Sequence, residues 1–488
     1  RFGNHSVSAL LLYNQRNYDD GDQVPYRTQG FAGRAAYTYA DRYIAEFNFG
    51  YNGSENFAKG NRFGFFPSIA AGWIVSEEEF MRPVQNYINK LKLRASYGLA
   101  GNDRFYNDDG SQKRFAYITT IGTTDGYKWG NSNAFYDKGG LREGDPGVES
   151  LTWETVKKAN VGIELGLFKM AELQVDFFHE RREDIFMQRK NIPSSAGFPS
   201  APWANYGIVT NKGFDISLDL NKQINKDWFI SARASVTYAK NKIIEQDEDL
   251  GVLGTYRSST GKPVGQIFGL VNDGLYTEAD FEDVTTGKLK PGLPVPKFSD
   301  RVYPGDIKYV DFNGDGEITE TDKTAIGGTV NPELVYGFGI NLSYKNIDFG
   351  AFFQGNGRTY RIIGENQKNF LPGSTIGAEG NIFTNASDAW TVDNPSQDVF
   401  YPRLHMGYNA NNAQVSDWWL KDMSMLRLKN VELGYSFSKN LIKKAAMEYA
   451  RIFVRGTNLL QFSKFDLWDP ELNTSNGLKY PIMATYSI

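Results

Sequence analysis

The chain has 488 residues, a formal net charge of −4 and no cysteine, which excludes disulfide, iron–sulfur and thiol chemistry and argues against a nucleic-acid partner. Its longest apolar run, Ile69 to Val75, is far shorter than the roughly 20 residues of a membrane-spanning helix, so a helical membrane protein is excluded as well. A membrane β-barrel is compatible with these numbers, because the lipid-facing side of a barrel occupies only every second residue of each strand.

Apolar and polar residues alternate in one segment after another, which predicts strands with one apolar and one polar face. In residues 213–221, for example, Phe214 and Ile216 alternate with Asp215 and Ser217. The other clear cases, in chain order, are residues 43–51, 160–167, 172–177 and 229–238. About 14 strands are expected in the whole chain.

The connections between these strands fall into two classes. Tight turns are expected around Asp41, Lys169, Asn225 and Asn346. Two further short links are expected to be helical: residues 76–90, which open with the capping-box spacing of Ser76 and Glu79, and a link that begins at Ser438. The long connections cover about residues 102–150, 188–205, 242–330 and 358–422.

Short and long connections alternate along the chain, so one end of the sheet carries tight turns and the other carries large loops. This asymmetry is typical of outer-membrane barrels, with short periplasmic turns and long extracellular loops. The polar face includes Glu46, Asn48, Glu164, Asp176, Asp215, Asp219 and Arg233. These groups need water or partners, which a wide lumen supplies. We therefore predict an all-β, transmembrane antiparallel β-barrel; the alternative is an open sheet whose polar face meets bulk solvent.

Residues 311–322, DFNGDGEITETD, have the spacing of a calcium-binding loop of the EF type. The predicted ligands are Asp311, Asn313, Asp315, Glu317 through its backbone carbonyl, Thr319 through water, and Asp322. Gly316 stands where such loops turn sharply, and the oxygen ligands favour Ca²⁺ over zinc.

The last ligand position holds Asp322 instead of the usual glutamate, and its shorter side chain reaches less far. The alternative is an Asx-rich turn without a metal. Because residues 242–330 form an unusually long connection that is entropically costly to order, we predict a structural Ca²⁺ that stiffens this extracellular loop.

No catalytic pattern is present, and the protein is not expected to be an enzyme. The histidines His5, His179 and His405 are scattered, and the loop pair Asp108 and Asp109 suits a solvated loop better than a glycosidase centre.

Tryptophan and arginine residues in the long loops are the candidates for substrate contact. These are Trp129, Trp203, Trp390, Arg358 and Arg361. For the tryptophans the alternatives are packing within the loops or a place at the membrane interface. Trp418 and Trp419 directly precede a strand, which favours a girdle or rim position for that pair.

Several stretches, in order along the whole chain, resemble SusC-like TonB-dependent outer-membrane transporters (the RagA/SusC family) of Bacteroidetes-type bacteria. They lie at residues 66–81, 152–168, 205–218, 305–327, 332–355, 426–437 and 452–471. The resemblance implies that residues 1–488 form the C-terminal part of a barrel of about 22 strands in the bacterial outer membrane, in contact with its lipid.

The same resemblance implies active import of a nutrient, an oligosaccharide or a peptide, with a SusD-like lipoprotein as a lid and TonB as the source of energy. We find neither a TonB box nor a plug domain in the chain, so active import and its coupling to TonB are expected of a longer parent protein. Two alternatives remain: a transporter-derived scaffold without uptake of its own, and a secreted, calcium-stabilised glycan-binding protein.

Overall fold

A computed structural model describes most of the chain. The described residues are 2–19, 21, 24–107, 110–131, 134–198, 200–364, 371–373, 384–438, 441, 443 and 447–488. Within these ranges no helix has both the length and the apolar character needed to cross a membrane.

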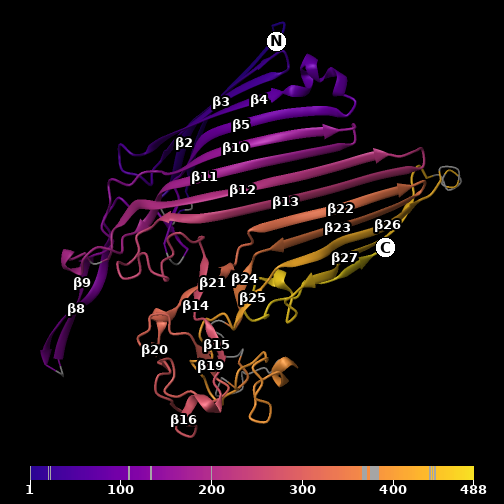
Figure 1. Cartoon of the computed structure of the whole chain (residues 1–488). Helices are drawn as coiled ribbons and strands as arrows, with labels where there is room; N and C mark the ends of the chain where they lie inside the picture. Colours follow the sequence, from indigo (N-terminus) through magenta and orange to yellow (C-terminus); the bar gives the residue numbers. More distant parts are fainter. Residues whose placement is uncertain are drawn as a thin grey trace. The chain divides into compact units, whose positions relative to one another are not determined.

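The long strands form one 14-stranded antiparallel sheet, in which neighbouring strands follow each other in chain order (Figure 1). Its strands are β1 (His5–Tyr18), β2 (Tyr26–Tyr39), β3 (Tyr43–Ser54), β4 (Phe63–Ile74), β5 (Ile88–Asn102), β10 (Glu154–Leu167), β11 (Ala171–Gln188), β12 (Trp203–Gln223), β13 (Trp228–Glu245), β22 (Leu334–Tyr344), β23 (Ile347–Gly357), β26 (Met425–Ser436), β27 (Arg451–Ser463) and β28 (Thr485–Ser487). The expected number of strands and the all-β fold class are confirmed.

The chain divides into two compact units. The first comprises Arg1–Asn221, Thr237–Leu253 and Thr260–Lys262, and the second comprises Lys222–Val236, Gly254–Ser259 and Pro263–Ile488.

The tight turns lie where they were expected. Ala40 and Asp41 have φ of 52° and 56°, and Phe168 and Lys169 have φ of 54° and 55°, the left-handed backbone of two-residue hairpin turns. In the β12–β13 turn, the side-chain oxygen of Asn225 accepts hydrogen bonds from the backbone N–H groups of residues 227 and 228. These turns set the register of the strands on either side.

The link over residues 76–90 is helical, as expected, but its helices are of the 3₁₀ type and the expected capping box is wrong. This segment forms two short 3₁₀ helices, η1 (Val75–Glu77) and η2 (Glu79–Val84), and Ser76 lies inside the first of them instead of capping a helix. Pro83 lies within η2 and has no N–H to donate, which disfavours a continuous α-helix here. Most of the link that begins at Ser438 lies outside the described residues.

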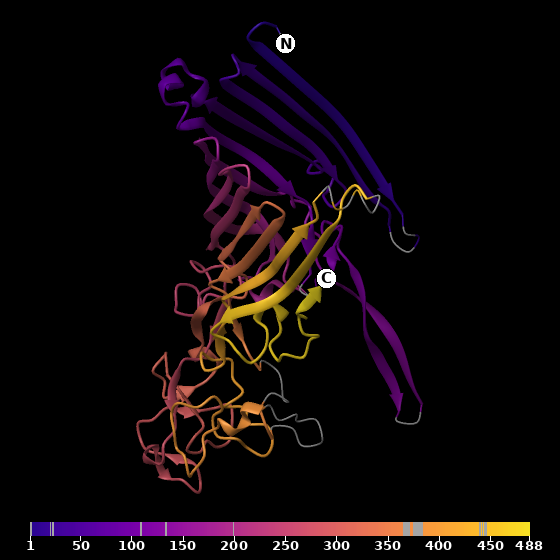
Figure 2. The same ribbon diagram turned by 90° about the vertical axis from the view of Figure 1, so that its right-hand side faces the viewer.

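The long connections carry small sheets of their own. In the first unit β6 (Phe105–Tyr106) pairs with β7 (Gln112–Lys113), and β8 (Ile121–Asn131) pairs with β9 (Ala134–Glu143). The β8–β9 hairpin projects beyond the strand ends of the first unit in both views (Figures 1 and 2).

In the second unit four further strand pairs form within the loops. They are β14 (Gln266–Gly269) with β21 (Thr324–Thr329), β15 (Asn272–Leu275) with β19 (Ile307–Tyr309), β18 (Val295–Pro296) with β20 (Glu317–Ile318), and β24 (Tyr360–Ile362) with β25 (Leu420–Asp422). A hairpin of β16 (Phe281–Asp283) and β17 (Lys288–Leu289) completes the set.

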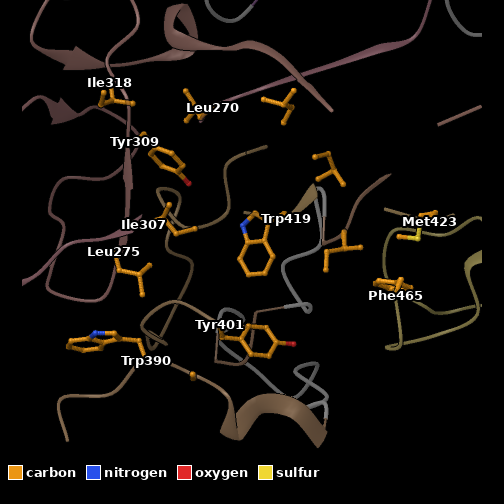
Figure 3. Close-up of a cluster of buried hydrophobic side chains, with 14 residues drawn as sticks. Leu270, Leu275, Ile307, Tyr309, Ile318, Trp390, Tyr401, Trp419, Met423 and Phe465 are labelled. Atoms are coloured by element: carbon orange, nitrogen blue, oxygen red, sulfur yellow. The ribbon is translucent and has the colours of Figure 1, made fainter. Parts of the chain in front are cut away.

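The largest buried apolar cluster lies in these loops of the second unit and not on the long strands (Figure 3). We call it the loop core. Its labelled members are Leu270, Leu275, Ile307, Tyr309, Ile318, Trp390, Tyr401, Trp419, Met423 and Phe465. A smaller cluster in the first unit contains Phe57, Phe105, Ala116, Leu151 and Trp153.

Candidate functional site

The apolar face of the long strands is exposed. Ile69 and Phe47 face each other across β3 and β4 and are 59% and 43% exposed, and Val161 and Phe177 face each other across β10 and β11 and are 56% and 57% exposed. A water-soluble sheet would cover such a row with a second layer. Exposure of these side chains is what contact with hydrocarbon requires.

Aromatic rings gather on this face near both ends of the strands in the first unit. Near the tight turns, the Tyr43 ring lies 6.5 Å from the Tyr39 ring and 6.4 Å from the Trp73 ring, measured between centroids. Toward the long loops, the rings of Tyr51 and Phe63 lie 5.1 Å apart. Tyrosine and tryptophan rings near both ends of an apolar face are typical of strands that cross a bilayer.

The opposite face carries paired charges. In the first unit Arg34 contacts Glu46 at 2.5 Å, and Arg94 contacts Asp176 at 2.6 Å. Lys90 and Lys92 both contact Glu164, at 3.0 and 3.2 Å.

The second unit repeats the pattern. Arg451 bridges Asp348 and Glu432, and Glu432 also accepts from Arg455 at 2.5 Å. Because these ions sit on the face away from the apolar row, the polar face suits a water-filled interior.

In the calcium-type loop, Asp311–Asp322, side-chain oxygens accept hydrogen bonds from backbone N–H groups of the same loop. Gly314 and Gly316 donate their N–H groups to the two carboxylate oxygens of Asp311, at 2.7 and 2.9 Å. The side-chain oxygens of Asn313 and Asp315 accept from the N–H groups two residues further on, at 2.9 and 2.8 Å. Each acceptor oxygen retains a second lone pair, so the first, third and fifth ligand positions fit a cation.

The side chains at the later ligand positions are already engaged in hydrogen bonds and an ion pair with other protein groups. Asp322 is fully buried, and its carboxylate accepts from the N–H groups of Phe312 at 3.0 Å and Thr319 at 2.8 Å. Thr319 and Asp322 form the capping box of η5 (Glu320–Asp322). The carboxylate of Glu317 pairs with Lys297 at 2.9 Å, which agrees with a ligand role only for its backbone carbonyl.

Within the part of the chain that the structure describes, no group of three or more His, Cys, Asp or Glu side chains is gathered as a metal cluster. A Ca²⁺ site in the loop therefore stays a prediction that depends on amide, hydroxyl and carbonyl oxygens as well as on carboxylates.

The three predicted tryptophans lie in different environments. Trp129 is exposed on the β8–β9 hairpin, where its ring lies 5.8 Å from that of Tyr127. Trp203 stacks on Phe186, with centroids 4.6 Å apart. Trp390 is buried in the loop core, which is the packing alternative for this residue.

The girdle or rim position expected for Trp418 and Trp419 is wrong. Trp419 is buried in the loop core and donates its indole N–H to the Asn412 carbonyl at 2.8 Å. Trp418 packs against the same core and donates to the Phe400 carbonyl at 3.1 Å. The strand that the pair directly precedes is β25, which belongs to a two-stranded sheet of the loops and not to the 14-stranded sheet.

The two predicted arginines both lie at the base of the loops in the second unit. Arg358 contacts Glu333 at 3.3 Å, and Arg361 donates to the side chain of Asn473. Both are therefore held by protein groups.

A buried polar cluster escaped the sequence reasoning. Asp306 is fully buried, and one carboxylate oxygen lies 2.5 Å from His405 Nε2 and accepts from the Asn412 side chain at 2.8 Å. The other oxygen accepts from the Tyr303 N–H at 2.8 Å. Since Asp306 and His405 are 99 positions apart, no local spacing could have linked them.

No protein-family model matches the chain. Among proteins of known class, it is 31% identical over 471 residues to the TonB-dependent receptor P26 of Formosa agariphila, covering 93% of the chain and 44% of the relative. It is 25% identical to the TonB-dependent receptor SusC of Bacteroides thetaiotaomicron, covering 97% of the chain and 45% of the relative. The chain thus spans less than half the length of these relatives, which are receptors and not enzymes.

The solved structure of the RagAB peptide importer in its closed-closed state matches 99% of the chain and 53% of its own chain, with a TM-score of 0.71 and 22% identity. At this identity the match supports the fold alone, an antiparallel β-barrel.

Proposed function

We propose a function from the premise that the chain is a barrel segment of the SusC-like TonB-dependent outer-membrane receptors: its parent protein imports a nutrient across the bacterial outer membrane. The observation that carries this proposal is the two-faced sheet, with exposed apolar side chains on one face and paired charges on the other. A wall of this kind separates lipid from a polar passage. The nutrient is an oligosaccharide or a peptide.

The proposed partners follow from the same premise. A SusD-like lipoprotein covers the extracellular loops, TonB acts through parts of the parent outside this chain, and lipid surrounds the apolar face. The loop core supports this arrangement, because it makes the loops of the second unit a folded body that a lid protein can contact.

Uptake in the source bacterium tests the import proposal. We expect deletion of the parent gene to abolish growth on one class of nutrient, either oligosaccharides or peptides, supplied as sole carbon source. Depletion of TonB should have the same effect, and reintroduction of the gene should restore growth only when TonB is present. Unchanged uptake of every nutrient in the deletion strain would favour a scaffold role.

Membrane extraction tests the second alternative, a secreted glycan-binding protein. A barrel with this exposed apolar face should stay with the outer membrane in high-salt and carbonate washes and leave it only in detergent. Release without detergent would contradict the barrel itself.

We also propose that Ca²⁺ binds the calcium-type loop and acts as a structural staple. The loop packs on its surroundings through the buried Ile318 and Asp322, so a cation held by Asp311, Asn313 and Asp315 would fix the exposed half of the same loop. Binding of Ca²⁺ would restrain a connection that is entropically costly to order.

Hydrogen exchange across residues 305–327 tests this staple. Added Ca²⁺ should slow exchange in the loop, and Asp315→Ala should remove that response. Glu320→Gln is a matched control, because Glu320 lies in the same loop but points its carboxylate toward Lys323 at 2.6 Å. If Ca²⁺ changes exchange in neither the native protein nor the control, the loop is an Asx-rich turn without a metal.

A further inference from the structure

A cavity of about 620 Å³ opens in the first unit, where the ends of β1 to β4 meet the segment 115–117. We call it the arginine cavity. Its chemistry comes from Arg16, Arg27, Arg62, Glu55, Phe115 and Tyr117, which all line it. Its volume is within the range of pockets that hold small ligands.

In the described lining of the arginine cavity, arginines outnumber carboxylates. Among the residues that the structure describes, no carboxylate pairs with Arg16, Arg27 or Arg62; Arg27 donates to the Asn17 side chain at 3.4 Å and Arg62 to the Phe57 carbonyl at 3.2 Å. Glu55, the acidic residue in the described lining, already accepts from Arg114 at 2.5 Å. Within the described lining, the guanidinium groups of Arg16, Arg27 and Arg62 therefore exceed the acidic groups and can pair with an anion from outside the protein.

The strand register places Arg16 on the polar face. Arg16 faces Thr28 across β1 and β2, and Thr28 is six residues from Arg34, so Arg16 shares a strand face with the Arg34–Glu46 pair. Arg16 thus belongs to the side of the sheet that the proposed passage uses, while Arg27, which faces Asn17, belongs to the other side, so the cavity lies across the strand ends.

The aromatic wall of the cavity is fixed in place. Arg114 donates to the carbonyls of Val24 at 2.6 Å and Pro25 at 3.0 Å, and its guanidinium lies 3.8 Å from the centre of the Tyr26 ring. Next to it, Phe115 has a φ of 51°, a strained backbone for a bulky aromatic residue. The buried Ala116 anchors this strained turn in the small apolar cluster of the first unit.

We propose that the arginine cavity binds an acidic oligosaccharide, whose carboxylate or sulfate group pairs with Arg16 and Arg62 and whose sugar ring lies against Phe115 or Tyr117. Planar guanidinium groups suit either anion, because they donate two parallel hydrogen bonds. The aromatic rings in the lining favour a sugar over an acidic peptide, since a sugar presents a flat apolar face for stacking. This proposal rests on the proposed function and names the nutrient class for it.

Direct binding to the full-length parent protein, purified in detergent, tests the proposal without any need for TonB. The probes are a trigalacturonate, a chondroitin sulfate hexasaccharide, neutral maltohexaose and a hexaglutamate peptide, each titrated by calorimetry at low and high salt. We expect at least one acidic oligosaccharide to bind, the neutral sugar to bind at least about tenfold more weakly, and affinity to fall with salt. The comparison of the uronate with the sulfate identifies the anion.

Variants then assign the binding to this cavity. Arg16→Gln and Arg62→Gln should each weaken the acidic oligosaccharide about tenfold, since each removes a charged hydrogen-bonding group. Arg62→Lys should retain part of the affinity. Arg104→Gln is the control, because Arg104 is exposed in the same unit and does not line the cavity. Heat-modifiable mobility in gels checks that each variant still forms a folded barrel.

Three results would overturn the proposal: equal affinity for neutral and acidic sugars, tighter binding of hexaglutamate than of either acidic sugar, or no binding of any probe. An unchanged affinity in both Arg→Gln variants would do the same. Because binding is measured on purified protein and import in cells, a failure of uptake leaves this result standing, and a failure of binding leaves nutrient import untouched.

Discussion

At the scale of single residues, buried carboxylates anchor the loops. Asp247 is nearly buried in the first unit and accepts from Arg189 Nε, from the Lys190 N–H and from the Asn191 side chain, each at 2.8 Å. Burial alone would raise the pKa of Asp247, but these hydrogen bonds outweigh burial and lower the pKa to about 2. The carboxylate thus ties residues 189–191 to the end of β13.

We predict that Asp247→Asn loosens this loop. An amide of similar shape keeps an oxygen acceptor but loses the charge that pairs with Arg189, and its NH₂ group faces donors. The expected cost is about 1–2 kcal/mol of local stability, from the lowered pKa and with allowance for screening by the water around Arg189. Hydrogen exchange of residues 189–202 should rise, while exchange in β10 stays unchanged; equal protection in the variant would contradict the anchor.

The pH dependence of the same anchor has a definite sign. Because the folded pKa lies below the ordinary value of about 3.9, the anchor contributes its full stability above pH 4 and loses it as the pH falls toward 2. Exchange in residues 189–202, corrected for its intrinsic pH dependence, should therefore rise between pH 4 and pH 2 in the native protein. Asp247→Asn should lack this transition.

At the scale of elements, the loop core depends on close packing around a glycine. Gly305 has a φ of 92°, and a Cβ at this position would lie 2.3 Å from atoms of the Trp390 ring. The neighbouring N–H of Arg403 donates to the Gly305 carbonyl at 2.7 Å, so the backbone cannot move away freely.

We predict that Gly305→Ala unfolds or loosens the loop core. Gly292→Ala is a matched control, because Gly292 has a φ of 90° but no atom lies within 4 Å of the place that its Cβ would take. Both variants carry the backbone strain of alanine at positive φ, about 1 kcal/mol, and only Gly305→Ala adds the clash with Trp390. Tryptophan fluorescence during denaturation should show a larger loss of stability for Gly305→Ala than for Gly292→Ala. Equal losses of stability would mean that the Trp390 ring moves aside at little cost.

The strands and turns were predictable because their signals are local. Alternation over a few residues defines the faces of β3 or β12, and Asn225 marks its turn by its own side chain. The loop core was not predictable, because its contacts join distant positions: Asn272 to Asp417 is a separation of 145 residues. The same reason explains why the position predicted for Trp419 was wrong, since the residues around Trp419 in space are not its neighbours in sequence.

The candidate sites divide in the same way. The Asx and glycine pattern of the calcium-type loop is contained in the consecutive residues 311–322, and the structure shows the hydrogen bonds that such spacing implies. The arginine cavity draws Arg16, Arg62 and Phe115 from three separate segments, and only the folded strands bring them together.

At the scale of the whole molecule, the two faces of the sheet have different environments. A charged substitution on each face tests which face meets lipid. We predict that Val161→Arg, on the exposed apolar face, destabilises the folded protein in lipid vesicles by about 2–4 kcal/mol if that position lies near the bilayer centre. Asn160→Arg, one residue away on the opposite face, should cost much less. Urea titration followed by gel mobility measures both, and equal costs would contradict a lipid-facing Val161.

The shared loop core also constrains how the two loop insertions that form it can change over time. Residues 263–330 and 384–423 are inserted between different strand pairs, yet they bury their apolar side chains against each other. Replacement of one insertion by that of a divergent relative would leave the apolar side chains of the other insertion without their packing partners and exposed to water. We therefore expect recombination between related chains to exchange the two insertions jointly, as an inherited pair.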